Sequence, residues 1–156
     1  MSCSLILAAA LAFSDPAVVE PAPVVVAEAP ASVASEPLFA DLVLRSVSLK
    51  AIVDGWIASG EADQSGFFAG PAYGRFKAQA TDLAARDMAG HEDLKARDLD
   101  GDLKCILRGI AEDMPRRLAA LEAATEAAER RQALEELAYL LNDNAEVITA
   151  PPRRAV

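Results

Sequence analysis

The sequence predicts an all-α protein, a small antiparallel bundle of about four helices. Apolar residues recur at steps of three and four through much of residues 39–148, which places them on single faces of helices. The chain is rich in alanine, glutamate and arginine, and only 5% of its residues are aromatic, which favours helices over sheets. The last two helical stretches are joined by a short connection, so they should be antiparallel neighbours.

Residues 1–14 are expected to form a signal-like leader. Positions 5–13 are an unbroken apolar run, too short to cross a bilayer as a helix but of the length found in secretory signals. Ala10 and Ala12 offer a small-x-small cleavage site, although no Lys or Arg precedes the run. We therefore expect export to the periplasm and loss of Cys3 from the mature chain. The alternative is a cytoplasmic protein.

Residues 15–37 are expected to be a disordered linker rich in proline, alanine and valine. Five of the nine prolines fall here, and proline removes amide donors and fixes φ, so regular structure is disfavoured. The folded domain should then cover residues 38–150, followed by a flexible basic tail at 151–156.

The first two helices are predicted from their apolar stripes and their flanking prolines and glycines. The first should run from Phe39 to Ser59, with this inward stripe: Leu42, Leu49, Ile52, Val53 and Trp56. The second should run from Tyr73 or Arg75 to about Lys95, with this stripe: Phe76, Ala80, Leu83, Ala84 and Met88. Trp56 is interpreted as a core anchor, because large aromatic side chains are usually buried.

The segment between these helices, residues 60–74, is predicted to be irregular and is the candidate contact site. Four glycines and a proline interrupt it, and it carries Phe67, Phe68 and Tyr73. These rings and Trp56 are the candidate partner or ligand contacts. The rings could also simply cap the end of the core. We expect one phenylalanine to pack near Trp56 and the other to be substantially exposed, because adjacent side chains of an extended segment point to opposite sides.

The third helix should run from Asp102 toward Ala124, with a kink or a new start at Asp113 caused by Pro115. Its stripe contains these residues: Leu103, Ile106, Leu107, Ile110, Met114, Leu118 and Leu121. The fourth helix should begin after Thr125, a plausible cap, and end near residues 142–148. Its stripe contains these residues: Leu134, Leu137, Ala138, Leu141, Ala145 and Ile148.

The aspartates at positions 98, 100 and 102 are the one cluster that resembles a metal motif. Alternating aspartates can offer oxygens to Ca²⁺, but an EF-hand loop also needs a glycine at position six and a glutamate at position twelve. Counted from Asp98, those positions hold Leu103 and Gly109. We therefore interpret the cluster as a helix start, with Asp100 or Asp102 as the cap.

No catalytic, cofactor or metal residues are predicted. The single histidine, His91, is interpreted as a surface or bundle-end residue; it shares a helix face with Met88, which excludes the pair as the two axial ligands of a haem. Cys105 is expected to be a small buried apolar residue, and whether it is free is left open. A triad or a two-histidine metal site lacks the necessary residues.

The charge balance narrows the class of partner. A net charge of −9 argues against a nucleic-acid backbone and against an anionic membrane surface. We therefore expect a non-enzymatic acidic helical protein of the cell envelope that binds a protein partner through a bundle face or the 60–74 segment. The alternative is a carrier of a small apolar ligand or metal ion in a pocket between helices. The oligomeric state and the partner's identity have no signal in the sequence.

Overall fold

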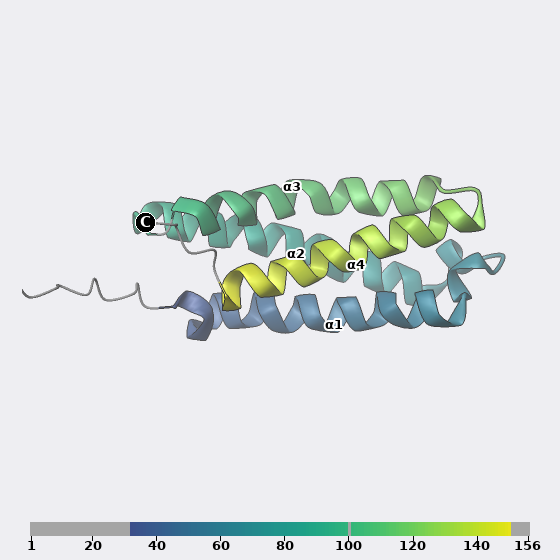
Figure 1. Cartoon of the computed structure of the whole chain (residues 1–156), viewed down its shortest axis with the longest axis horizontal. Coiled ribbons are helices and arrows are strands. Elements are labelled where there is room, and N and C mark those ends of the chain that lie inside the picture. The colour runs from purple at the N-terminus through teal and green to yellow at the C-terminus, as the bar shows by residue number, and fades with distance from the viewer. Residues whose placement is uncertain (1–31, 100, 151–156) are drawn as a thin grey trace, which may run out of the picture. The chain divides into compact units, whose positions relative to one another are not determined.

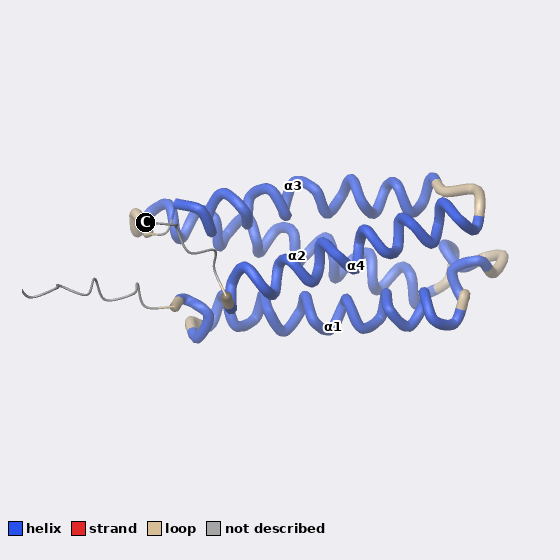
Figure 2. The backbone as a smooth tube through the Cα atoms, viewed as in Figure 1, coloured by secondary structure: helices blue, strands red, loops and turns tan. Residues whose placement is uncertain are grey.

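The computed structural model describes residues 32–99 and 101–150 of the 156-residue chain. Within these residues the protein is all-helical, without strands, and four long helices pack against one another (Figure 2). This confirms the predicted fold class. The expected leader, most of the expected linker and the expected basic tail lie outside the described residues.

The helices follow one another with short connections. Two short 3₁₀ helices, η2 and η3, fill most of the segment between the first two long helices. The elements in chain order are η1 (Val33–Ser35), α1 (Pro37–Ser59), η2 (Glu61–Asp63), η3 (Phe67–Ala69), α2 (Pro71–Ala96), α3 (Gly101–Ala123) and α4 (Ala127–Thr149). The end of the expected linker is therefore structured: η1 covers Val33–Ser35, Glu36 caps η1 and α1, and Pro37 begins α1.

The four long helices lie side by side as an up-down-up-down bundle (Figure 1). Each packs against two neighbours: α1 against α2 and α4, and α3 against α2 and α4. Helices α1 and α3 are therefore diagonal, as are α2 and α4. Such an arrangement follows from short connections between successive helices.

The core lies between the four helices and is mostly leucine and phenylalanine. Its largest side chains with almost no exposed surface are Phe39, Phe76, Leu42, Leu83, Leu94, Leu103, Leu107, Met114, Leu121, Leu137, Leu141 and Ile148. Five residues of the predicted stripes differ from expectation: Ile52 is exposed, and the other four are only partly buried, namely Ala84, Met88, Ile106 and Ala145. They lie on the flanks of their helices, where the periodic pattern separates core from surface least sharply.

Proline and glycine set the ends of α1 and α2. Pro37 and Pro71 occupy the first turns, where a missing amide proton costs no helix bond. Gly60 ends α1 with φ of 68°, a left-handed conformation that glycine adopts without steric cost.

Helices α3 and α4 depart from two sequence expectations. Helix α3 continues through Pro115, so of the kink and the new start at Asp113 that were the two expected outcomes, the new start is wrong. Pro115 is exposed, while Met114 and Leu118 on either side are buried, so packing holds both halves in one helix. Helix α4 is capped by Glu126 in a capping box with Glu129, not by Thr125.

None of the helices in the described ranges is long and apolar enough to cross a lipid bilayer.

Candidate functional site

The aromatic residues predicted as contacts gather at the end of the bundle where α1 finishes and α2 begins. The ring centroids of Trp56 and Phe67 are 4.9 Å apart, and those of Trp56 and Phe76 are 4.8 Å apart, both edge to face. Trp56, Phe67 and Tyr73 are all buried. Edge-to-face contacts of this kind add to the burial of each ring, so the cluster closes this end of the core.

Phe68 differs from the expectation of an exposed ring. It is half-buried, with centroids 5.1 Å from Phe67 and 4.9 Å from Tyr73, and the Arg130 guanidinium lies 6.0 Å from its centre. The expectation assumed an extended segment, whereas residues 67–69 form a 3₁₀ helix, in which neighbouring side chains do not point to opposite sides.

Arg130 of α4 fastens the segment between α1 and α2 to the bundle. Its guanidinium donates to Asp63 Oδ1 at 2.8 Å and to the carbonyl oxygens of Ala124 and Thr125 at 3.2 and 3.1 Å. The Arg130 side chain is largely buried, so these bonds are shielded from solvent. Residues 60–70 are thus held in place rather than left as an open lid.

Tyr73 links the cluster to α3. Its hydroxyl donates to Glu122 Oε1 at 3.0 Å, and Lys77 Nζ donates to the same oxygen at 2.6 Å. Burial, followed by the bond to the Glu122 carboxylate, raises the pKa of the Tyr73 hydroxyl well above its usual range, so it stays protonated. This arrangement holds Tyr73 in place.

A shallow groove of about 480 Å³ lies beside the cluster, between the end of α1 and the start of α4. Small residues form much of its lining. Its large apolar residues are Trp56, Ile57 and Leu134, and its charged residues are Asp63 and Arg131. An apolar group would fit it.

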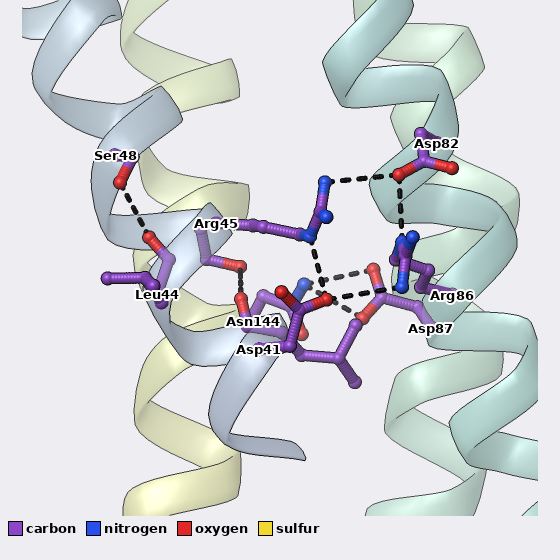
Figure 3. A network of polar contacts seen from close by, with 10 residues as sticks. Asp41, Leu44, Arg45, Ser48, Asp82, Arg86, Asp87 and Asn144 are labelled. Carbon is purple, nitrogen blue, oxygen red and sulfur yellow. Dashed lines mark hydrogen bonds and ion pairs between the residues drawn. The ribbon is translucent and has the colours of Figure 1, made fainter. Parts of the chain in front are cut away.

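A second feature, which sequence reasoning missed, is a polar pair buried in the core. Asp87 of α2 and Asn144 of α4 have no exposed surface. Asn144 Nδ2 donates to both carboxylate oxygens of Asp87, at 3.0 and 2.9 Å, and so joins the diagonal helices (Figure 3). Burial raises the pKa of Asp87 to about 7, although the bond from Asn144 opposes the shift.

An ion-pair network covers the surface of the α1–α2 interface close to this pair (Figure 3). Arg45 contacts Asp41 at 2.7 Å and Asp82 at 3.1 Å, and Arg86 contacts Asp82 at 2.8 Å and Asp41 at 3.3 Å. The network satisfies its own charges across two helices. It therefore offers no unpaired charge to a ligand.

The outer face of α1 is the third feature. Leu44 and Val47 are 67% and 54% exposed there. The remaining residues of this face, all exposed and uncharged, are Ala40, Ser48, Ala51, Gly55 and Ala58. We call these seven residues the α1 outer face. Beside Leu44 the surface is hollowed by about 290 Å³, between α1 and Gln79 of α2.

Other residues singled out in the sequence do not assemble into a site. His91 is buried, not at the surface, and its Nδ1 donates to the Lys104 carbonyl oxygen at 2.7 Å. Cys105 is exposed, not buried, because it lies opposite the apolar stripe of α3. Asp98 and Asp102 belong to no metal-ligating cluster within the described residues, and Asp100 is outside them.

Sequence signals for the missed features exist. Asp87 follows Leu83 by four residues and precedes Leu94 by seven, and Asn144 lies between Leu141 and Ile148 at steps of three and four. Polar residues at core positions of two helices are the signal for a buried pair. The α1 outer face is visible in the sequence as uncharged residues that recur at steps of three and four from Ala40 to Ala58.

Comparison with known proteins identifies no relative: the chain matches no family model, no curated protein and no solved structure.

Proposed function

We propose that this protein is a non-enzymatic interaction module that binds a protein partner through the α1 outer face. The observation that carries the proposal is that Leu44 and Val47 stand exposed on a face of α1 whose other residues are small and uncharged. Contiguous exposed apolar surface on a soluble domain is typical of a protein-binding site.

The 60–74 segment, the other contact site considered from the sequence, has less support. Trp56, Phe67 and Tyr73 are buried, and Phe68 is packed beneath Arg130. A partner would have to displace this packing to reach the rings. The α1 outer face needs no such rearrangement, because its side chains already point to solvent.

Site-specific photo-crosslinking tests the proposal. A photo-reactive amino acid at position 44, in the full chain expressed in its native host, should give covalent protein adducts. The matched control places the same group at Ala119, an exposed residue of α3, which is diagonal to α1. Adducts from position 44 alone support the proposal, whereas equal yields from both positions, or none from position 44, contradict it.

The cellular site of this interaction is part of the proposal. The apolar run at residues 5–13 supports export to the periplasm. The intact mass of the protein isolated from its host decides between a processed exported chain and a full-length cytoplasmic one.

A second candidate function is the carriage of a small apolar ligand in the groove beside Trp56. The groove volume of about 480 Å³ favours it, since ligand pockets typically start at roughly 300 Å³. Trp56 is the only tryptophan, so its fluorescence reports on this groove directly. Titration with an apolar dye should change Trp56 emission in the normal chain but not when Ala128→Phe fills the groove; an unchanged emission in both excludes this function.

A further inference from the structure

We propose that the partner of the α1 outer face is a second copy of this chain, with the two α1 helices antiparallel about a two-fold axis at the level of residue 49. This inference rests on the proposed function and names its partner. Homodimers with two-fold symmetry are the commonest oligomers, and their interface must be complementary to itself. The α1 outer face meets that requirement in charge and in shape.

The charge argument starts from the whole protein, which carries a net charge of −9. Helix α1 has four charged residues that sum to zero, and all four are paired within the protein: Asp41 with Arg45 at 2.7 Å, and Lys50 with Asp54 at 2.8 Å. Two copies can therefore meet through α1 without bringing unpaired carboxylates together. A strongly basic partner would gain no favourable contact on this face.

The shape argument rests on the order of large and small residues along the face. The N-terminal half holds the two large side chains, Leu44 and Val47, whereas the C-terminal half holds Ala51, Gly55 and Ala58. One half thus protrudes and the other is flat. A Cβ added at Gly55 would meet nothing within 4 Å, so the surface at that position is open to an incoming side chain.

An antiparallel pairing places each protruding half on the flat half of the other copy. With the axis at residue 49, Val47 faces Ala51 of the second copy, and Leu44 comes level with Asp54, one residue before Gly55. Ala40 then faces Ala58. Facing large residues with small ones is the arrangement that fills space between helices. A parallel pairing would set Leu44 against Leu44 and leave a gap between the two Gly55 residues.

The contact is confined to one helix from each copy, so the interface is at the small end of the range for specific complexes. We therefore expect a dimer with a dissociation constant in the micromolar range rather than an obligate one. The bundle core is complete without the second copy, so loss of the dimer should leave the fold unchanged.

Sedimentation equilibrium of the purified full chain, from low micromolar to millimolar concentration, tests the proposal. The normal chain should shift from 16.4 kDa toward twice that mass.

Leu44→Glu should weaken dimerisation by at least about tenfold, because it buries an unpaired charge at the interface. Gly55→Leu should weaken it too, because its larger side chain would occupy the open surface on which Leu44 of the second copy packs. Ala119→Glu on α3 adds the same charge as Leu44→Glu and should leave the dimer intact. Circular dichroism and thermal melting of each variant confirm that the bundle is still folded.

Disulfide crosslinking tests the orientation in a chain whose Cys3 and Cys105 are replaced by serine. Val47→Cys together with Ala51→Cys should give crosslinked dimers on oxidation, because these positions face each other in the antiparallel pairing. Leu44→Cys alone should not, because its two copies would lie ten residues apart, about 15 Å along the helix. Crosslinking through position 44 alone would overturn the antiparallel pairing.

A chain that stays monomeric at every concentration, or a dimer unaffected by Leu44→Glu, overturns this inference. The proposed function survives that result only if photo-crosslinking from position 44 captures a different protein, identified by mass spectrometry. If position 44 captures nothing and the chain is monomeric, both proposals fail.

Discussion

At the scale of single residues, the buried pair of Asp87 and Asn144 is the least expected feature of the bundle. The Asn144 amide nitrogen serves both carboxylate oxygens, while Asn144 Oδ1 is buried without a hydrogen-bond partner. A buried carboxylate without a cation and a buried carbonyl without a donor both cost free energy. The pair is therefore a specific but expensive link between α2 and α4, which do not otherwise pack as neighbours.

The first prediction concerns the pH dependence of this link. The pKa of Asp87 is about 7 in the folded protein and 3.8 in the reference state, so between these values the folded state binds a proton that the unfolded state lacks. Stability must therefore fall as the pH rises from about 4 to about 7. Asp87→Asn should remove this loss and be more stable than the normal chain at pH 8, by up to roughly 4 kcal/mol. Urea unfolding of both chains at pH 4, 6 and 8 measures this difference in stability.

Asp82→Asn is the matched control for this prediction. The bond from Arg86 holds the pKa of Asp82 below its usual range, so its contribution to stability is present at neutral pH and is lost as the pH falls. Removing that carboxylate should not stabilise the protein at pH 8. If the free energies of unfolding of the normal chain and of Asp87→Asn changed with pH in the same way, Asp87 would not retain its proton in the folded state.

At the scale of elements, α3 shows how tertiary packing overrides a local signal. Pro115 lacks the amide proton that would bond to the Ala111 carbonyl, yet the helix runs unbroken from Gly101 to Ala123. The residues on both sides of Pro115 belong to the core, and their burial offsets the lost bond. The sequence could predict the apolar stripe of α3 but not whether the helix continues through Pro115, because continuation depends on contacts with α2 and α4.

The second prediction is that Pro115→Ala stabilises the protein. The change restores the bond to the Ala111 carbonyl and should add about 1–3 kcal/mol to the free energy of unfolding. Gly109→Ala is the control for helix propensity alone, because it changes another exposed position of α3 where an added Cβ meets nothing within 4 Å. It should add about 0.5–1 kcal/mol to the free energy of unfolding. A Pro115→Ala chain no more stable than Gly109→Ala would contradict the argument.

The third prediction separates the two phenylalanines of η3. Phe67 is buried against Trp56, whereas Phe68 is half-buried beneath Arg130. Phe67→Ser should therefore cost about 3 kcal/mol or more and shift Trp56 fluorescence to longer wavelength, because water reaches the indole. Phe68→Ser should cost clearly less and leave the emission nearly unchanged. Equal losses from the two substitutions would mean that both rings are equally part of the core.

At the scale of the whole molecule, sequence periodicity predicted the all-α bundle and most core residues, because burial of one helix face leaves a regular pattern. It did not predict which solvent-exposed residues would form one continuous surface. Leu44 and Val47 fell outside every predicted stripe, but only the packing of α1 between α2 and α4 shows that they form one exposed surface. Asp87 was missed because a carboxylate breaks the apolar pattern even where the helix is buried.

The last prediction concerns where the folded domain begins. Every buried residue within the described ranges lies between Val33 and Ile148, and η1 packs against both α1 and α4. A chain that starts at Ser32 should therefore have the same melting temperature and the same helical signal per folded residue as the full chain.

A chain that starts at Leu38 loses the buried Val33 side chain and the Glu36 partner of Arg97, which bonds to that guanidinium at 2.6 and 2.8 Å. The exposed ion pair should matter little, but loss of the Val33 contacts should cost about 1–2 kcal/mol and lower the melting temperature by several degrees. Val33→Ala in the chain that starts at Ser32 should reproduce most of that loss, whereas Glu36→Gln should not. If removal of residues 1–31 alone lowered the melting temperature as much, the stabilising contacts of this domain would extend beyond the helices that form its core.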